Sequence, residues 1–284
     1  MSKHDDVRNQ VSRSYANAVS RPAQQACCCG GEAATRGAVA KLAGYTSEEL
    51  NSMPADAAVN SFGCGNPVAF SEIGEGEVVL DLGSGAGIDL LLAAKKAGPK
   101  GRVIGIDMTD EMIARAEENI REAGLDNVEV RKGIIEKLPV DDASVDWVIS
   151  NCVINLSPEK PKVFAEIARV LKPGGRMLVS DIVARDLPEW IRKSAQMYSS
   201  CVAGAISEED YLEGLRSAGL EETEVRDRLV YDSSQLQAFV DSDPEFAESM
   251  SCCGTKPDKD MVQRILKEVT GNIWSARIFA RKPQ

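Results

Sequence analysis

The sequence is poor in histidine, in aromatic residues and in long apolar runs. Its 284 residues contain one histidine and only 5% aromatic residues. No segment approaches the roughly 18 uninterrupted apolar residues that a membrane-spanning helix needs. The N-terminal segment MSKHDDVRNQ is polar and lacks the apolar stretch of a secretory signal. We therefore expect a cytoplasmic protein that contacts no membrane.

Basic residues are also in the minority. The chain has 33 Lys and Arg residues against 44 Asp and Glu residues, which gives a formal net charge of −11. A phosphate backbone would meet net repulsion from such a surface. Nucleic acid is therefore not expected as a partner, and a small-molecule substrate is.

The eight cysteines lack the spacing of a zinc or thioredoxin-like motif. They occupy positions 27, 28, 29, 64, 152, 201, 252 and 253, with no Cys-x-x-Cys pair, and the single histidine is His4. Zinc ribbons, zinc fingers and thioredoxin-like pairs are therefore disfavoured. In a chain without a secretory signal thiols stay reduced, so these cysteines indicate ligation or redox chemistry more than structural disulfides.

From residue 78 to residue 181, short apolar runs alternate with segments of helical period. This alternation is typical of βαβ units around a parallel sheet. The expected strands are 78–83, 102–108, 128–133, 145–151 and 175–181, and the expected helices are 88–97, 110–123 with Thr109 as N-cap, and 159–171. The pattern predicts a doubly wound, Rossmann-like α/β fold.

The flanking regions show a weaker pattern. Residues 188–201 and 208–218 are expected to be helices, and residues 275–281 a last strand. We expect three parts: an N-terminal cap with a cysteine-bearing segment at 1–65, a cofactor-binding core at 66–185, and a smaller C-terminal α/β region at 186–284 that covers the substrate.

A glycine-rich loop follows the first expected strand. The segment Asp81-Leu-Gly-Ser-Gly-Ala-Gly87 opens a helix, and its glycines allow a sharp turn close to a ligand. Asp107 lies 20 residues further on, at the end of the second strand, where a carboxylate can hold a ribose. A dinucleotide fingerprint would require glycine at position 88, where this chain has Ile88.

The Asp-x-Gly-x-Gly-x-Gly arrangement resembles the first motif of class I S-adenosylmethionine-dependent methyltransferases. The resemblance implies that the loop wraps the amino-acid end of S-adenosylmethionine, that the second strand's acid holds the ribose, and that residues after the third strand flank the adenine. The implied cofactor residues are Asp81, Gly83, Ser84, Gly85, Gly87, Asp107, Met108, Ile135, Glu136 and Asn151. Asp107 as a mere helix cap and Glu136 as a solvated loop charge remain as alternatives.

Cys152 directly follows the fourth expected strand. In a doubly wound sheet, ligands bind outside the carboxyl ends of the strands, so this thiol should lie beside the cofactor. A packed core thiol is the alternative, because free cysteine is among the most buried residue types.

The segments around three cysteines resemble those of the arsenite S-adenosylmethionine methyltransferases. They are Ser-Phe-Gly-Cys64-Gly-Asn-Pro, Ser-Asn-Cys152-Val-Ile-Asn-Leu-Ser-Pro and Ser-Ser-Cys201-Val-Ala-Gly-Ala. The resemblance runs from about residue 60 to residue 205. It implies that Cys64, Cys152 and Cys201 bind trivalent arsenic, which is soft and prefers thiolates.

By the same resemblance, a fourth cysteine near the N-terminus serves a redox step, with Cys27, Cys28 and Cys29 as candidates. A thiol reductant such as thioredoxin or glutathione would then reopen a disulfide. The triplet could instead be an exposed loop without a fixed partner. Cys252 and Cys253 could capture arsenite or belong to a variable loop.

These features together predict a monomeric arsenite methyltransferase that uses S-adenosylmethionine. Two alternatives stay open. One is a methyltransferase acting on an organic oxygen, nitrogen or carbon nucleophile, in which the cysteines only pack. The other is a thiol-based metalloid-binding protein that consumes no cofactor.

Overall fold

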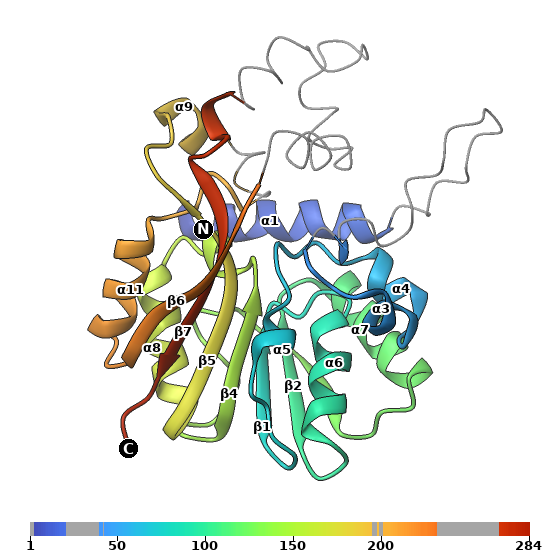
Figure 1. Cartoon of the computed structure of the whole chain (residues 1–284). Coiled ribbons are helices and arrows are strands. Elements are labelled where there is room, and N and C mark those ends of the chain that lie inside the picture. The colour runs from blue at the N-terminus through green and yellow to red at the C-terminus, as the bar shows by residue number, and fades with distance from the viewer. Residues whose placement is uncertain (1–2, 21–39, 42, 195–197, 199–200, 232–266) are drawn as a thin grey trace, which may run out of the picture.

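In the computed structural model, the described residues are 3–20, 40–41, 43–194, 198, 201–231 and 267–284. They form a seven-stranded sheet of order β3-β2-β1-β4-β5-β7-β6, with helices on both faces (Figure 1). The strands are β1 Val78–Leu82, β2 Arg102–Asp107, β3 Val128–Lys132, β4 Val145–Asn151, β5 Leu171–Ala184, β6 Glu221–Val230 and β7 Ile273–Arg281. Strands β1 to β5 are mutually parallel, and β7 is antiparallel to both β5 and β6. The predicted doubly wound α/β fold is confirmed.

Helices and short turns connect the strands and cover the sheet. Their bounds are α1 Lys3–Ser20, α3 Ser47–Asn51, α4 Ala55–Val59, α5 Pro67–Phe70, α6 Ile88–Ala97, α7 Asp110–Glu122, η1 Ile154–Leu156, α8 Lys160–Val170, α9 Glu189–Arg192 and α11 Glu208–Ser217.

Successive residues of each central strand point to opposite faces and join two separate apolar cores. Leu80 of β1 packs in one core, which α8 and α11 cover. Its neighbour Val79 packs in the other, beside α5 and α6. Because both faces are buried, the central strands are nearly continuous apolar runs. This is why the sequence predicted them within a few residues, apart from β5, which begins at Leu171 and ends at Ala184.

Helix α1 lies within the segment 1–65, where caps and loops were expected. It extends over 18 residues, and Figure 1 shows it crossing the sheet at the end where the glycine-rich loop lies. Few apolar residues mark its inner face: Val11 and Val19 are buried, whereas Arg8 and Ser12 make polar contacts with the core. A helix that binds through polar groups leaves only a weak apolar stripe in the sequence.

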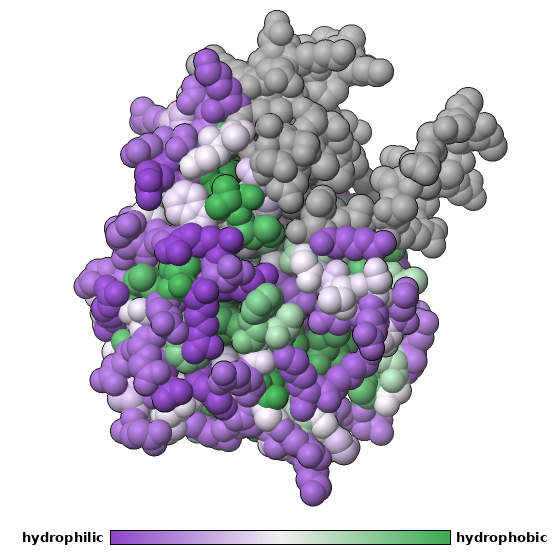
Figure 2. Space-filling view, in the orientation of Figure 1, coloured by the Kyte–Doolittle hydropathy of each residue, from purple (hydrophilic) through white to green (hydrophobic). Residues whose placement is uncertain are grey.

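Strand β6 was missed for a similar reason. Its sequence Glu-Glu-Thr-Glu-Val-Arg-Asp-Arg-Leu-Val is mostly charged, and all of its residues are exposed or half-buried at the edge of the sheet. Charged side chains on an edge strand discourage pairing with other chains. Hydrophilic residues cover most of the face seen in Figure 2, and some apolar side chains are visible near the upper ends of β6 and β7.

Two local predictions were confirmed only in part. A helix over 188–201 was expected, and the described part of this segment contains α9 and a helical Tyr198. The helix is not continuous, because Lys193 and Ser194 are non-helical, and Cys201 has a φ of +63°, which no α-helix tolerates. Thr109 does occupy the N-cap of α7, but its side chain makes no capping hydrogen bond. Its hydroxyl lies 3.3 Å from the Ser12 hydroxyl of α1 instead.

Among the helices that the structure describes, none combines the length and the apolar character needed to cross a bilayer.

Candidate active site

The glycine-rich loop between β1 and α6 packs tightly against the end of β4. A Cβ at Gly83, where φ is +67°, would come within 2.4 Å of the Val153 side chain. The N–H groups of Gly83 and Ser84 donate to the Ile106 carbonyl at 2.7 and 3.0 Å. At Gly85 a Cβ would meet no atom within 4 Å, so this side of the loop is open. The loop is anchored on one side and free to accept a ligand on the other.

A cavity lies beside this loop at the carboxyl ends of the strands. Its wall includes nine of the ten predicted cofactor residues, namely Asp81, Gly83, Ser84, Gly85, Asp107, Met108, Ile135, Glu136 and Asn151. Gly87 is the exception: it forms the N-cap of α6 with a φ of +95° and does not line the cavity. Cys152 also lies in the wall.

Three aspartates, Asp81, Asp89 and Asp107, line the cavity. Asp81 and Asp89 are only 2% and 3% exposed. Burial raises the pKa of Asp81 well above its usual range, and the charges of Asp89 and Asp107 raise it further. Burial likewise raises the pKa of Asp89 to about 6, against hydrogen bonds from Tyr45 and Asn151 that lower it. Among the described residues, no Lys, Arg or His forms an ion pair with Asp81 or Asp89, so a cationic ligand would relieve an unfavourable burial of charge.

Asp107 joins two parts of the cavity wall. One carboxylate oxygen accepts from the Gly85 N–H at 3.0 Å, and the other accepts from the Thr109 N–H at 2.9 Å. Burial raises the pKa of Asp107, although these backbone donors lower it. The residue therefore ties the glycine-rich loop to the start of α7, beyond the simple capping role considered above.

Glu136 is buried and paired, not a solvated loop charge. Its side chain is 4% exposed and lies 3.2 Å from the guanidinium of Arg8 on α1. The Ser157 hydroxyl donates to the same carboxylate at 2.6 Å. Arg8 also reaches Glu159 at 2.5 Å, so one cation of α1 holds two acids of the core.

Helix α1 adds residues to the cavity that the sequence did not indicate. Arg8, Val11 and Tyr15 all line it. Their spacing of three and four residues places them on one face of the helix. This spacing was the only feature of the sequence that could have indicated a helix facing the cavity. It was too weak for a prediction, because Val11 is the only aliphatic residue of the three.

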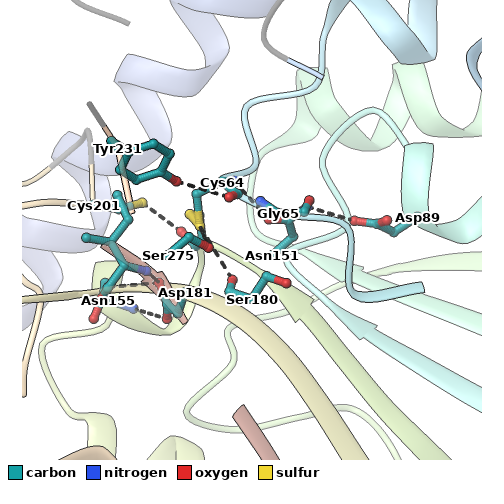
Figure 3. Close-up of a disulfide and its surroundings, with 12 residues drawn as sticks. Cys64, Gly65, Asp89, Asn151, Asn155, Ser180, Asp181, Cys201, Tyr231 and Ser275 are labelled. Carbon is teal, nitrogen blue, oxygen red and sulfur yellow. Dashed lines mark hydrogen bonds between the residues drawn. A yellow bond between two sulfur atoms is a disulfide. The ribbon is translucent and has the colours of Figure 1, made fainter. Parts of the chain in front are cut away.

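Asn151 was predicted only to help bind the cofactor, but its side chain also makes hydrogen bonds with the Cys64 segment. Its Oδ1 accepts from the N–H groups of Cys64 and Gly65 at 3.0 and 3.1 Å. Its Nδ2 donates to the Gly65 carbonyl at 2.6 Å, to the Tyr45 hydroxyl at 2.9 Å and to Asp89 at 3.2 Å. Figure 3 shows this amide between Asp89 and the Cys64 segment.

Cys64 and Cys152, separated by 88 residues, form a disulfide with their Cα atoms 5.8 Å apart (Figure 3). Both are 4% exposed and belong to an apolar cluster that also contains Cys201. The expectation of reduced thiols is thus not met at this pair. The reason is geometric: the Cys64 segment is anchored on Asn151, the residue directly before Cys152.

Cys201 is a free, buried thiol beside this disulfide. Its Sγ donates to the Cys152 carbonyl oxygen at 2.7 Å. Burial and the charge of Asp181 raise the pKa of this thiol well above its usual range, whereas a hydrogen bond from Tyr15 and the charge of Lys160 lower it. The structure therefore brings all three predicted arsenic-binding residues into one cluster, in an oxidised arrangement of two of them.

Two of these cysteines have unusual backbone angles. Cys152 has a φ of +60° and Cys201 a φ of +63°, in the left-handed region that few residues other than glycine and asparagine occupy. Such conformations cost of order 1–3 kcal/mol each and cluster at functional sites. If Cys152 were only a buried packing residue, nothing would explain this cost in conformational free energy.

The remaining predicted cysteines, Cys27, Cys28, Cys29, Cys252 and Cys253, lie outside the described residues. Within the part of the chain that is described, no group of three or more His, Cys, Asp or Glu side chains is placed to hold a metal ion. Binding of arsenic by three sulfur atoms therefore requires the Cys64–Cys152 disulfide to be reduced first.

The cavity fits the groups of S-adenosylmethionine. Its ammonium group would supply the positive charge that Asp81 and Asp89 lack, and its ribose hydroxyls could donate to the lone pairs of Asp107 that remain available. The buried Ser84 hydroxyl, in the same wall, has no hydrogen-bond partner among the described residues.

Known proteins resemble this chain in sequence and in fold. A family model described as a methyltransferase domain matches residues 73–219. An arsenite methyltransferase of Halobacterium salinarum is 43% identical over 237 residues, which is 82% of this chain and 59% of that protein. The crystal structure of an arsenic(III) S-adenosylmethionine methyltransferase from Chlamydomonas reinhardtii has a TM-score of 0.56 and 31% identity, and covers 87% of this chain and 73% of that one. The chain belongs to the arsenite methyltransferase family.

This membership confirms the resemblance carried by the three cysteine segments. A second arsenite methyltransferase, from Mus musculus, is 36% identical over 71% of this chain and 54% of that protein. The chain thus spans less than two thirds of the curated arsenite methyltransferases that it matches. Structural similarity extends to a Haemonchus contortus phosphoethanolamine N-methyltransferase at 21% identity and a TM-score of 0.59, which reflects the shared fold alone.

Proposed function

We propose that this chain methylates trivalent arsenic, with S-adenosylmethionine as the methyl donor. One observation carries the proposal: Cys64, Cys152 and Cys201, from distant parts of the chain, lie in one buried cluster, and Cys152 also lines the cavity. Membership of the arsenite methyltransferase family supports the same substrate.

The cavity residues would hold the methyl donor by charge and hydrogen bonding. Asp81 and Asp89 would pair with its ammonium group, and Asp107 would accept from its ribose. Ile135 and Glu136 would flank the adenine at the end that α1 covers. When bound, S-adenosylmethionine supplies an electrophilic methyl group.

The three sulfur atoms would hold and aim the substrate. Trivalent arsenic bound by three thiolates is pyramidal and keeps a lone pair on its open side, and that pair is the nucleophile. Because no proton leaves the attacking arsenic, no general base is required. The only histidine, His4, lies 3.4 Å from Glu159. Holding the reactants in position would then supply most of the acceleration.

The observed disulfide matches the electron count of such a reaction. Transfer of a methyl cation to the arsenic lone pair raises its formal oxidation state from III to V, so two electrons are needed to restore the trivalent state. Two thiols that become a disulfide release two electrons, and Cys64 and Cys152 are such a pair. A dithiol or glutathione would then reduce the disulfide by thiol exchange. Cys27, Cys28 or Cys29 would serve as relay in this exchange.

The test follows a labelled methyl group. The whole chain, reduced beforehand, is incubated with arsenite, glutathione and methyl-labelled S-adenosylmethionine, and arsenic species are separated by mass spectrometry. Label in methylated arsenic together with S-adenosylhomocysteine supports the proposal. S-adenosylhomocysteine without labelled arsenic indicates another acceptor, and arsenite binding without any turnover indicates a metalloid-binding protein.

The Cys152→Ser variant makes the test specific to the cysteine cluster. We expect it to abolish methyl transfer to arsenic while S-adenosylhomocysteine still binds with nearly unchanged affinity, because the aspartates of the cavity are untouched. Unimpaired production of methylarsenicals by this variant would reject the assignment of Cys152.

A further inference from the structure

We propose that Asn151 is a positioning residue that couples occupation of the cofactor cavity to the placement of Cys64. In other words, the methyl donor and arsenic should each bind more tightly when the other is present. This inference rests on the proposed function, because it concerns the same two ligands. It goes beyond that function by naming the group through which the two sites communicate.

On the substrate side, Asn151 holds the backbone on both sides of the Cys64 side chain. It accepts from the N–H of Cys64 at 3.0 Å and makes two hydrogen bonds with Gly65, one to the N–H and one to the carbonyl. The approach is so close that a Cβ at Gly63 would come within 2.2 Å of the Asn151 amide. The position of the Cys64 sulfur therefore depends on the orientation of this amide.

On the cofactor side, the same amide contacts a carboxylate of the cavity wall. Nδ2 donates to Asp89 at 3.2 Å and to the Tyr45 hydroxyl at 2.9 Å, and Tyr45 in turn donates to Asp89 at 2.8 Å. Tyr45 and Asp89 are buried, each with 3% of its surface exposed. Asp89 and Asn151 both line the cavity.

A cation in the cavity would act on both sides through this chain of contacts. The ammonium group of a bound ligand would pair with Asp81 and Asp89 and hold the Asp89 carboxylate in place. Hydrogen bonds to a charged carboxylate are shorter and about twice as strong as neutral ones. The Asn151 amide would then be fixed more firmly, and with it the Cys64 backbone. Because less ordering remains to be done when arsenic binds, arsenic would bind more tightly.

An asparagine is the side chain that can do this. Its amide carries an acceptor and two donors on one rigid plane, so the two halves cannot turn independently. Aspartate has nearly the same shape but places an oxygen where Nδ2 now faces three oxygen atoms. Asn151 also directly precedes Cys152, so the same residue sets the positions of two of the three proposed arsenic ligands.

Calorimetry on the full, reduced chain can measure the coupling directly. The dissociation constant of arsenite is measured with and without saturating S-adenosylhomocysteine, which carries the ammonium group but transfers no methyl. We expect arsenite to bind about tenfold more tightly with S-adenosylhomocysteine present, within the range typical of coupled sites. The affinity for S-adenosylhomocysteine must change by the same factor when arsenite is present, because coupling of binding free energies is reciprocal.

Two variants assign the coupling to Asn151. Asn151→Asp should reduce the factor to roughly twofold or less, since the link to Asp89 becomes repulsive. Tyr45→Phe removes the hydroxyl that bridges Asp89 and Asn151, so it should also lower the factor. Asn127→Asp is the matched control, because Asn127 ties a loop at the opposite end of the sheet by bonds to Gly98 and Gly101.

The outcomes separate this inference from the proposed function. Equal arsenite affinities with and without S-adenosylhomocysteine in the parent chain overturn the coupling, even if methylated arsenic is produced. A coupling factor that survives in Asn151→Asp overturns the role of Asn151. Failure of arsenite to bind at all rejects the proposed function itself. A tenfold factor that is lost in Asn151→Asp and kept in Asn127→Asp supports the inference.

Discussion

The thiol of Cys201 lies directly against the backbone of Cys152, with its sulfur 2.7 Å from the Cys152 carbonyl oxygen. Cys152 is at the same time bonded through its own sulfur to Cys64. Three cysteines from three separate segments thus meet in one buried cluster, and Cys152 among them lines the cavity. This convergence is the basis of the first prediction.

Replacing Cys201 should weaken the binding of an arsenical that needs three thiols more than the binding of one that needs two. Arsenite binds three thiolates, whereas an aryl arsenical such as phenylarsine oxide binds two. Cys201→Ala should therefore weaken arsenite binding about tenfold or more, which corresponds to at least about 1.4 kcal/mol, and affect phenylarsine oxide far less. Calorimetry on the reduced protein measures both affinities. Equal losses for the two compounds would show that Cys201 is not a separate third ligand.

Removing the Tyr15 hydroxyl should make the Cys201 thiol harder to ionise. Tyr15 lines the cavity, packs edge-on against Phe62 with ring centroids 5.8 Å apart, and its hydrogen bond lowers the pKa of Cys201. Tyr15→Phe keeps the ring and loses this bond. In a Cys64→Ser, Cys152→Ser background, alkylation of Cys201 should need a higher pH in the variant. An unchanged pH profile would contradict the role of the hydroxyl.

Replacing Arg8 should destabilise the protein because it leaves the buried carboxylate of Glu136 without a cationic partner. Glu136 has a side chain only 4% exposed, and Arg8 of α1 is its cationic partner. Arg8→Met leaves this charge unpaired and should lower the free energy of unfolding by about 1–3 kcal/mol in urea titrations. Adding Glu136→Gln should recover part of the loss.

The control for Arg8 is an ion pair on the surface. Arg121 and Glu118 lie 3.4 Å apart with side chains 76% and 60% exposed. Arg121→Met should change stability by less than about 0.5 kcal/mol, because exposed pairs are screened by solvent. If Arg8→Met and Arg121→Met lower the free energy of unfolding by the same amount, the Arg8–Glu136 ion pair does not hold α1 to the core.

The buried Asp181 should make stability fall as the pH rises. Burial raises the pKa of Asp181 from 3.8 to about 7, although the charge of Lys160 opposes this shift. The folded state therefore holds a proton that the unfolded chain has already lost, and its contribution to stability is complete below about pH 4 and disappears as the pH rises through 7.

Urea titrations of the parent and of Asp181→Asn at pH 4.5 and pH 8 test this sign. The parent should lose stability relative to the variant between the two pH values, by at most roughly 4 kcal/mol for a shift of this size. Asp110→Asn, at an exposed ion pair with Lys132, is the control. A parent that gains stability relative to Asp181→Asn on raising the pH would contradict the burial of a neutral carboxyl here.

Strands β1, β2 and β4 could be predicted from the sequence because most of their residues are buried, on both faces of the sheet. Burial on both faces makes them continuous apolar runs, which stand out between glycines and helical segments. Helix α1 and strand β6 could not, since both present charged residues. In α1 these make specific ion pairs with the core, and in β6 they lie on an exposed edge.

Local sequence pattern was enough to predict the α/β fold, the glycine-rich cofactor loop and the three cysteine segments, because glycine spacing and strand ends are properties of neighbouring residues. Three contacts became visible only in the folded chain: Asn151 anchors the Cys64 segment, Arg8 pairs with Glu136, and Cys64 is bonded to Cys152. These contacts join residues 87, 128 and 88 positions apart, and which distant side chains meet depends on how the helices and strands pack.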